Sequence, residues 1–413
     1  MRRPSKRSSR KLSADSQRLV AYAQAVMDAA SRIEERAWES ELDRLLTRLL
    51  RTGHQDVVDA ALDHAFNTAG GAYDALMESV EAVSESTCVE HEGQRYDALL
   101  VAAPILAWTR FSIASGSISQ DSVITLAAHL NAHLLAPDVR LAMAPTLYAI
   151  DQLPRTHAET FALTTQMAMA ALKGTPLKPL ANPPETAPFL ADTRYLLATL
   201  VVPQGAPLFR WQSEGNPQER DLALAQWQAQ AAPNISRLLP GCGIELLLPE
   251  AYYVACREAD KRIRPASIRA AVHYLTHTLN VEASGLQAIV GGFGDDLGDN
   301  RIDEYRVSFT LHRKSEVVYG LVWPLYGQED GEPAEGILPP GLAGAASAEQ
   351  RTPLEEILAL LRECGVTHVK HHRGCFPMEI CDDCGAPLYL DPEAELVHAE
   401  MPEDTPAPTT HFH

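Results

Sequence analysis

Residues 98–108 have the sequence Ala98-Leu-Leu-Val-Ala-Ala-Pro-Ile-Leu-Ala-Trp108, a continuous apolar run of strand length. A run of this kind is typical of a strand in a sheet that is covered on at least one face. It is followed by a helix-like segment at 121–135, an apolar segment at 139–150 and a second helix-like segment at 157–172. Apolar strands that alternate with amphipathic helices predict a sheet with helices packed on it, and therefore an α/β fold.

The same order occurs again about one hundred residues later in the chain. The apolar run 195–203 is followed by a helix-like segment at 219–232, an apolar run at 243–249 and a helix-like segment at 264–279. Leu-Ala-Met-Ala-Pro145 before Leu147-Tyr148 resembles Leu-Leu-Leu-Pro249 before Tyr252-Tyr253, and Trp108-Thr-Arg110 resembles Arg210-Trp211. These matches predict an internal duplication. The alternative is that any two β-α-β-α segments look alike.

The regions outside this repeat give further boundaries. Leucines at helical spacing, Leu42, Leu45, Leu46, Leu49 and Leu50, predict a helical front section, and residues 305–311 and 317–325 predict a β-hairpin. We divide the chain into a basic tail (1–15), a helical section (16–95), a first α/β unit (96–172), a proline-rich linker (173–188), a second α/β unit (189–328), a second linker (329–353), a helix with a cysteine-containing module (354–401) and a tail (402–413).

The cysteine-containing module concentrates metal-ligating side chains. Cys381-Asp-Asp-Cys384-Gly385 is typical of a zinc knuckle, in which a tight turn points two sulfurs at one cation. Residues 388–390 and 395–397 are expected to pair in a register that sets Pro387 opposite His398 and so returns the imidazole to Cys384. A structural zinc ion needs four protein ligands. We expect these to be Cys381, Cys384, His398 and Cys375, with His371 or His372 as alternatives for the fourth.

Other interpretations of the cysteine pair stay open. The two thiols could be free surface cysteines. They could also form a thioredoxin-like redox pair, but such a pair normally opens a helix, and Gly385-Ala-Pro387 disfavours a helix at this point. A catalytic zinc ion keeps one position open for water beside a general base. Glu379, Asp382 and Asp383 are close in sequence, but two cysteine ligands with a third nearby favour a closed structural site.

A Gly/Asp loop at 291–300 is a second candidate site. Its acidic residues and the one that follows, Asp295, Asp296, Asp299 and Asp303, supply oxygen ligands that suit calcium or magnesium. The spacing does not fit an EF-hand, and these carboxylates would repel a phosphate group. A solvated hairpin loop is therefore the default expectation.

Paired histidines at i and i+4, His129/His133 and His273/His277, each share one helix face. The zincin motif requires a glutamate directly after the first histidine, and Leu130 and Tyr274 stand there instead. We expect ordinary amphipathic helices. The sequence has no nucleophile elbow, Walker loop or dinucleotide fingerprint in a strand–helix context.

Charge restricts the classes of partner. The net charge is −19, and residues 1–11 hold six basic residues and no acidic one, so the remainder of the chain carries −25. A body this acidic repels nucleic acid and anionic membranes, so nucleic-acid binding is expected only through residues 1–11, if at all. The longest apolar run is much shorter than the ~20 residues of a membrane span, and no hydrophobic segment of a secretion signal follows the basic tail.

The cysteine content points to a compartment. Four of the seven cysteines lie between Cys364 and Cys384, and the total is odd. This pattern suits a reducing cytoplasm with a metal site better than a secreted disulfide framework. We therefore expect a cytoplasmic protein without a membrane segment.

The stretch Phe376-Pro-Met-Glu-Ile-Cys-Asp-Asp-Cys-Gly-Ala-Pro-Leu-Tyr389, with Glu395-Leu-Val-His-Ala-Glu-Met-Pro-Glu403, resembles a family of uncharacterised cytoplasmic proteins from betaproteobacteria. The layout of α/β halves interrupted by prolines is also similar, over most of the chain beyond the basic tail. The resemblance implies a bacterial origin. It implies no activity, substrate or catalytic residue, because the family is one of unknown function.

Three hypotheses about function follow. The first is a non-catalytic cytoplasmic protein that binds an unknown protein partner or small ligand and carries a structural zinc ion in its C-terminal module. The second is an enzyme whose site lies between the two α/β units near the Asp295–Asp303 loop. The third is an RNA- or ribosome-associated factor that uses residues 1–11. Whether the chain is an enzyme at all is left open, with the balance against it.

Overall fold

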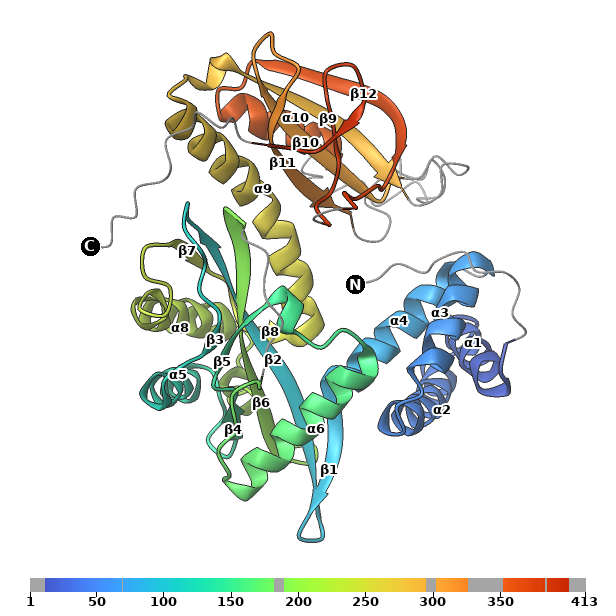
Figure 1. The fold of residues 1–413 in the computed structure, drawn as a ribbon. Helices are drawn as coiled ribbons and strands as arrows, with labels where there is room; N and C mark the ends of the chain where they lie inside the picture. The colour runs from blue at the N-terminus through green and yellow to red at the C-terminus, as the bar shows by residue number, and fades with distance from the viewer. Residues whose placement is uncertain are drawn as a thin grey trace. The chain divides into compact units, whose positions relative to one another are not determined.

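The structure, a computed structural model, describes residues 12–68, 70–181, 189–294, 302–325, 352–382 and 385–400. Helices and strands are mixed along the chain after a helical N-terminal region, which confirms the predicted α/β class (Figure 1). The chain forms two compact units. Unit 1 comprises residues 1–107, 113–188 and 193–260, and unit 2 comprises residues 108–112, 189–192 and 261–413.

Unit 1 begins with a helical layer of four helices, α1 (Ala14–Met27), α2 (Arg32–Arg51), α3 (Gln55–Thr68) and α4 (Gly70–Glu85). Ser13 and Ser31 cap α1 and α2, because their side chains accept backbone N–H groups of the first turn. The five leucines predicted to form an apolar stripe on α2 are all buried. They pack with α1, α3 and α4, and Phe161 of a later helix joins the same cluster. This layer is therefore held together by an apolar core.

A single sheet follows. Its strands are β1 (Ser86–His91), β2 (Gln94–Trp108), β3 (Gly116–Ser117), β4 (Arg140–Met143), β5 (Thr146–Ala149), β6 (Ala191–Pro203), β7 (Gly243–Leu246) and β8 (Glu250–Ala251). The intervening helices are α5 (Gln120–His133), a 3₁₀ turn (Ile150–Gln152), α6 (His157–Lys173), α7 (Arg210–Ser213), α8 (Glu219–Ser236) and α9 (Tyr252–Leu279). The order is β1-β2-β6-β5-β3, β4 also pairs with β6, and β7 and β8 pair with β2.

The two predicted halves exchange strands within this sheet. β4, from the first half, pairs with β6, from the second half. Next to β4, the Ala144 N–H donates to the Leu197 carbonyl at 2.9 Å. In the same way β7, from the second half, pairs with β2, from the first half, and the Leu247 N–H donates to the Pro104 carbonyl at 2.9 Å. Pro145 and Pro249 each follow a short strand, β4 and β7, but Leu147-Tyr148 lie in β5 whereas Tyr252-Tyr253 begin α9. The first sequence resemblance therefore falls on equivalent positions only in part.

The second resemblance does not fall on equivalent positions, since Trp108 ends β2 whereas Arg210 begins α7. The faces of the sheet are covered by different helices. Residues of β2 at 101, 103, 105 and 107 pack under α5 and α8, which lie side by side (Figure 1). Tyr96 and Ala98 of the same strand pack instead with α6. Successive side chains of a strand point to opposite faces, so both faces of β2 are buried, where the sequence predicted cover on at least one face.

Unit 2 is built on a four-stranded sheet of β9 (Leu286–Gly294), β10 (Glu304–Leu311), β11 (Val317–Pro324) and β12 (His368–Pro377), in the order β11-β10-β9-β12. The first three strands are antiparallel, which confirms the predicted hairpin, and β12 is parallel to β9. A 3₁₀ turn (Ala283–Gly285) precedes β9, and α10 (Pro353–Glu363) precedes β12. The part of α9 beyond residue 260 and α10 cover one face of this sheet through a core that includes Phe309 and Trp323.

The opposite face of this sheet carries the C-terminal module, which we define as residues 379–400. Its short hairpin consists of β13 (Tyr389–Leu390) and β14 (Leu396–Val397). Glycines in the sheet make room for it. A Cβ atom at Gly291 would lie 2.2 Å from Leu390 Cδ1, and one at Gly320 would lie 2.5 Å from the Tyr389 ring. The module is therefore seated on positions where the sheet has no side chain.

Candidate functional site

The predicted zinc knuckle folds as a tight turn in the part that the structure describes. The Gly385 N–H donates to the Cys381 carbonyl and the Cys381 N–H donates to the Ala386 carbonyl, each at 2.8 Å. Gly385 has a φ of +71°, a conformation that a side chain would strain, as the glycine in the motif predicts. Ile380 and Pro387 continue the ladder as a bridge. The position of Cys384 lies outside the described residues.

A buried arginine holds the two arms of this turn to the sheet. Arg306 Nη1 donates to the Glu379 carbonyl at 2.8 Å and also to the Leu388 carbonyl. Its Nε lies 2.6 Å from Glu304 Oε1, and its guanidinium carbon lies 4.3 Å from the centre of the Phe293 ring. Ser308 Oγ donates to the carbonyl of Leu390 in the following hairpin. The module is therefore attached to β10 by polar contacts, in addition to the apolar packing of Leu390 on the sheet.

The register of the hairpin differs from the expected one by one residue. Tyr389 pairs with Val397 and Leu390 with Leu396, so His398 follows opposite Leu388 and not opposite Pro387. His398 is two residues from Leu396 and therefore shares its face, and Leu396 packs against the sheet with Leu390. His398 is half-buried, and its Nδ1 lies 3.3 Å from Glu400 Oε1.

The upstream candidates for a fourth ligand all lie on β12, but they pair with different residues of β9. His372 pairs with Gly291, the position that faces Leu390 of the module. Cys375 pairs with Gly292 after a bulge, and a Cβ atom there would meet Ile302, whose side chain packs with the core on the other face. The Nε2 atom of His372 is buried and has no hydrogen-bond partner within the described residues.

His371 directly precedes His372 on β12, pairs with Val290 and is exposed. Burial of part of the ring and the nearby Arg373 lower its pKa. Within the described residues, no three His, Cys, Asp or Glu side chains form a group that could hold a metal ion. The candidate ligands that the structure describes here are two half-buried thiols, Cys375 and Cys381, and the imidazoles of His372 and His398.

The other predicted sites lie elsewhere. Of the acidic loop, Asp295, Asp296 and Asp299 are outside the described residues, as are residues 1–11. Asp303 is described, and its backbone N–H donates to the Phe293 carbonyl at 2.7 Å.

Both histidine pairs are present on helices. The His129 and His133 rings are stacked at 6.4 Å on α5, where His129 Nε2 lies 3.0 Å from the Asn234 side chain. The His273 and His277 rings are 4.2 Å apart on α9, and the His277 Nδ1 atom lies 2.8 Å from the His273 carbonyl oxygen. Each pair is thus engaged in local contacts of its own helix or of the helix beside it.

A cluster of titratable groups that the sequence did not reveal is buried in unit 1. Glu85, at the end of α4, accepts the Tyr253 N–H at 2.8 Å, and Arg257 Nη1 contacts Glu81 Oε1 at 2.7 Å. Burial raises the pKa of Glu85 to about 7, against the opposing effect of the Tyr253 N–H. Burial likewise lowers the pKa of His157 to about 4. The carboxylates are thus bonded within the cluster, and His157 Nδ1 lies 3.2 Å from the Gln55 side chain.

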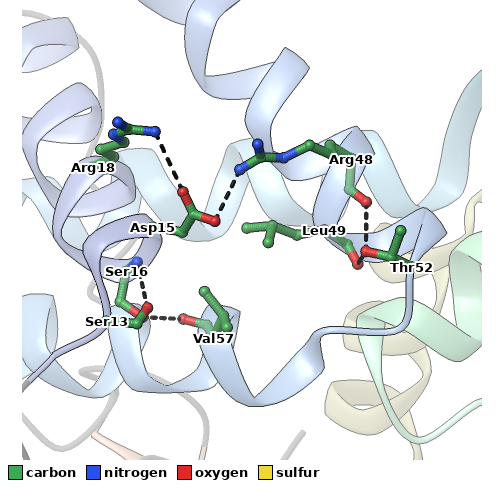
Figure 2. Close-up of polar contacts among 8 residues, drawn as sticks. All are labelled: Ser13, Asp15, Ser16, Arg18, Arg48, Leu49, Thr52 and Val57. Atoms are coloured by element: carbon green, nitrogen blue, oxygen red, sulfur yellow. Dashed lines mark hydrogen bonds and ion pairs between the residues drawn. The ribbon is translucent and has the colours of Figure 1, made fainter.

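Unit 1 also has an open groove of about 700 Å³ between α2 and the start of the sheet. Four arginines line it, and the other lining residues come from α2, the end of α4 and the start of β1. Figure 2 shows two of the lining residues, Arg48 and Thr52, and Asp15 of α1, which lies between the guanidinium groups of Arg18 and Arg48, at 3.5 Å and 2.9 Å. In the same view the Thr52 hydroxyl donates to the Arg48 carbonyl at 2.9 Å and closes the last turn of α2.

Sequence reasoning missed this groove, although part of its signal was present. Arg44, Arg48 and Arg51 recur at helical spacing on α2, beside the leucine stripe that was recognised. Arg95 comes from β2, and only the fold brings it to the same groove. A search for a basic face on each predicted helix would have found three of the four arginines.

Comparison with known proteins gives a family but no function. A family model described as "Protein of unknown function (DUF2863)" matches residues 4–412, nearly the whole chain. No curated protein and no solved structure matches the chain. Among the described helices, none combines the length and the apolar character that a membrane crossing requires.

Proposed function

Because the chain belongs to DUF2863, a family of proteins of unknown function, we propose a role from the geometry alone. The protein is a non-catalytic cytoplasmic protein that binds a partner or small ligand, and a structural zinc ion stabilises its C-terminal module. The single observation that carries the zinc proposal is the turn at Cys381, with Gly385 at a φ of +71° and both arms bonded to each other and to Arg306.

The ligand set follows from which side chains face the module. Cys381 lies in the turn, Cys384 is its partner in the Cys-x-x-Cys sequence, and His398 returns on the hairpin face that packs against the sheet. For the fourth position we now favour His372 over Cys375, since His372 pairs with Gly291 under the module and its Nε2 has no protein partner among the described residues. Two thiolates and two imidazoles form a set that zinc accepts.

A metal at this place would serve stability. The module is short, and few of its side chains are fully buried: Tyr389, Leu390 and Asp391. A small region that buries so little apolar area commonly depends on a metal or a disulfide for its stability. When bound, zinc would join the knuckle, the hairpin and β12, and four protein ligands would leave no position open for a reacting water.

The binding part of the proposal is supported by the groove in unit 1. Its charged groups are mainly arginines, which cannot be deprotonated in proteins and so cannot act as a general base. Groups of this kind hold an anion rather than transfer its protons. The cytoplasmic part is supported by four free thiols, Cys88, Cys242, Cys256 and Cys364, which suit a reducing compartment.

Elemental analysis of the purified full-length protein tests the zinc proposal. We expect one zinc ion per chain, lost from Cys381→Ser, Cys384→Ser and His372→Ala. Cys364→Ser is the matched control, since this thiol lies at the C-cap of α10 and outside the module, and it should keep the metal. Loss of zinc from Cys375→Ser together with retention of zinc in His372→Ala would identify Cys375, and not His372, as the fourth ligand.

The whole zinc proposal fails if the wild-type protein holds no zinc after purification with added zinc. It also fails if Cys381→Ser retains a full equivalent.

A further inference from the structure

The groove of unit 1 has a charge opposite to that of the protein around it. Of its twelve lining residues, Arg44, Arg48, Arg51 and Arg95 are basic and Asp43 is the one acidic residue. The chain as a whole carries a net charge of −19. A local excess of arginine in an acidic protein is not explained by composition, and it attracts anions that the rest of the surface repels.

Two of the four arginines are neutralised and two are not. Arg44 Nη1 contacts Glu41 at 2.6 Å, and Arg48 Nη2 contacts Asp15 at 2.9 Å. Arg51 and Arg95 make no ion pair within the part of the chain that the structure describes. Glu90 stands opposite Arg95 in the β1–β2 register, but no ion pair joins them there. Two guanidinium groups are thus available to a ligand from outside.

The helix dipole accounts for only part of this arrangement. Arg48 and Arg51 lie in the last turn of α2, where a positive charge stabilises the helix end. Arg95 belongs to β2 and gains nothing from that dipole. Its presence in the same groove therefore points to a ligand that needs positive charge from two sides.

The remaining lining residues suit an oxyanion attached to a less polar body. Thr47 and Thr87 offer hydroxyl groups, and Ala82 near the end of α4 offers an exposed apolar side chain. The one acidic lining residue, Asp43, is exposed and is outnumbered by the four arginines.

We propose that this groove binds a small organic molecule that bears phosphate groups, held by Arg51 and Arg95. Guanidinium groups bind phosphate through paired, charge-assisted hydrogen bonds. A groove of about 700 Å³ is far larger than a phosphate ion and falls within the usual size range of small-molecule sites. The inference names the ligand class for the binding part of the proposed function and is independent of the zinc ion.

Calorimetric titration of the full-length protein tests the inference, with inorganic pyrophosphate, ADP and a 12-nucleotide single-stranded RNA as probes. We expect ADP and pyrophosphate to bind at one site per chain and more tightly at low salt. Each of Arg51→Gln and Arg95→Gln should weaken binding about tenfold or more, the loss expected for one charge-assisted contact.

Arg36→Gln is the matched control, because Arg36 is exposed on the same helix and does not line the groove. It should leave the affinity unchanged. The inference is overturned if neither small probe binds at low salt, or if the Arg51→Gln and Arg95→Gln double variant binds as well as the wild type. If RNA binds more tightly than ADP and this binding is lost in the double variant, the proposal that the ligand is a small molecule is wrong.

Cys88 gives a second measurement that does not depend on a variant folding well. This half-buried thiol lines the groove. Bound pyrophosphate should slow its alkylation by iodoacetamide and leave that of Cys364 unchanged, as resolved by mass spectrometry. Equal alkylation of Cys88 with and without saturating pyrophosphate would count against the site. Zinc content, measured in the same samples, separates a failure here from a failure of the zinc proposal.

Discussion

The C-terminal module and the helical layer of unit 1 use the same side chain, arginine, for opposite purposes. Arg306 is buried under the module, with its guanidinium bonded to two carbonyls and a carboxylate and stacked on Phe293. Arg51 and Arg95 are exposed beside the helical layer and have no ion-pair partner among the described residues. The helical layer is held by leucines, so its arginines remain available, whereas the module has little apolar core and depends on its arginine.

The difference shows how an arginine that stabilises the fold can be distinguished from an arginine that binds a ligand. A buried guanidinium must have its hydrogen bonds satisfied inside the protein, because an uncompensated buried charge is strongly destabilising. A guanidinium that lines a groove can satisfy them with water until a ligand arrives. The number of internal partners, and not the residue type, indicates the role.

The largest effect is expected from Arg306→Met, which tests whether the module depends on this side chain. The change leaves the Glu304 carboxylate and two carbonyls without their donor, and removing one partner of a buried pair destabilises a protein by about 3–5 kcal/mol. Denaturant unfolding should show this loss. Arg51→Met, the matched variant in the helical layer, should change the free energy of unfolding by less than about 0.5 kcal/mol. Equal losses in the two variants would remove the distinction between the regions.

A smaller, pH-dependent effect is expected from Glu85→Gln at the base of the helical layer. The folded pKa of Glu85, about 7, is higher than the ordinary value of 4.5 because of burial, with Glu81 adding to the shift and the Tyr253 N–H and Arg257 opposing it. The fold therefore favours the protonated carboxyl. Wild-type stability should fall as the pH rises from about 4.5 to about 7, by at most about 3 kcal/mol.

The glutamine variant removes this ionisation and can still accept the Tyr253 N–H. It should be more stable than the wild type at pH 8 and equal to it at pH 4, as measured by thermal unfolding across the pH range. Glu90→Gln, at an exposed position of β1, is the control and should show no such trend. A stability gain of Glu85→Gln that is the same at both pH values would contradict the ionisation account.

Much of the fold could be predicted from sequence, because apolar periodicity records burial directly. The runs 98–108 and 195–203 correspond to β2 and β6, and the leucine stripe corresponds to α2. The exchange of strands between the two halves could not be predicted, since the sequence of β4 does not indicate whether β2 or β6 will be its partner. Hairpin register was wrong by one residue because both faces of a two-residue strand are apolar here: Tyr389 and Leu390 are both buried.

The candidate sites were accessible from sequence to different degrees. The cysteine pair is a local motif, so its turn was predictable, whereas the choice among Cys375, His371 and His372 depends on the register of β12 against β9. Arg306 and Arg95 were overlooked because each acts on residues distant in sequence. The apposition of α2 and β2 that forms the groove is a property of the folded chain alone.

Hydrogen–deuterium exchange of the full-length protein, followed by mass spectrometry, tests the contrast between the two regions most directly. We predict that a zinc chelator raises exchange in residues 372–398 and leaves residues 44–52 and 86–95 unchanged. Saturating pyrophosphate should lower exchange in residues 44–52 and 86–95 and leave the module unchanged. A chelator effect that is absent from the module, or pyrophosphate protection that lies outside the groove, would contradict the account.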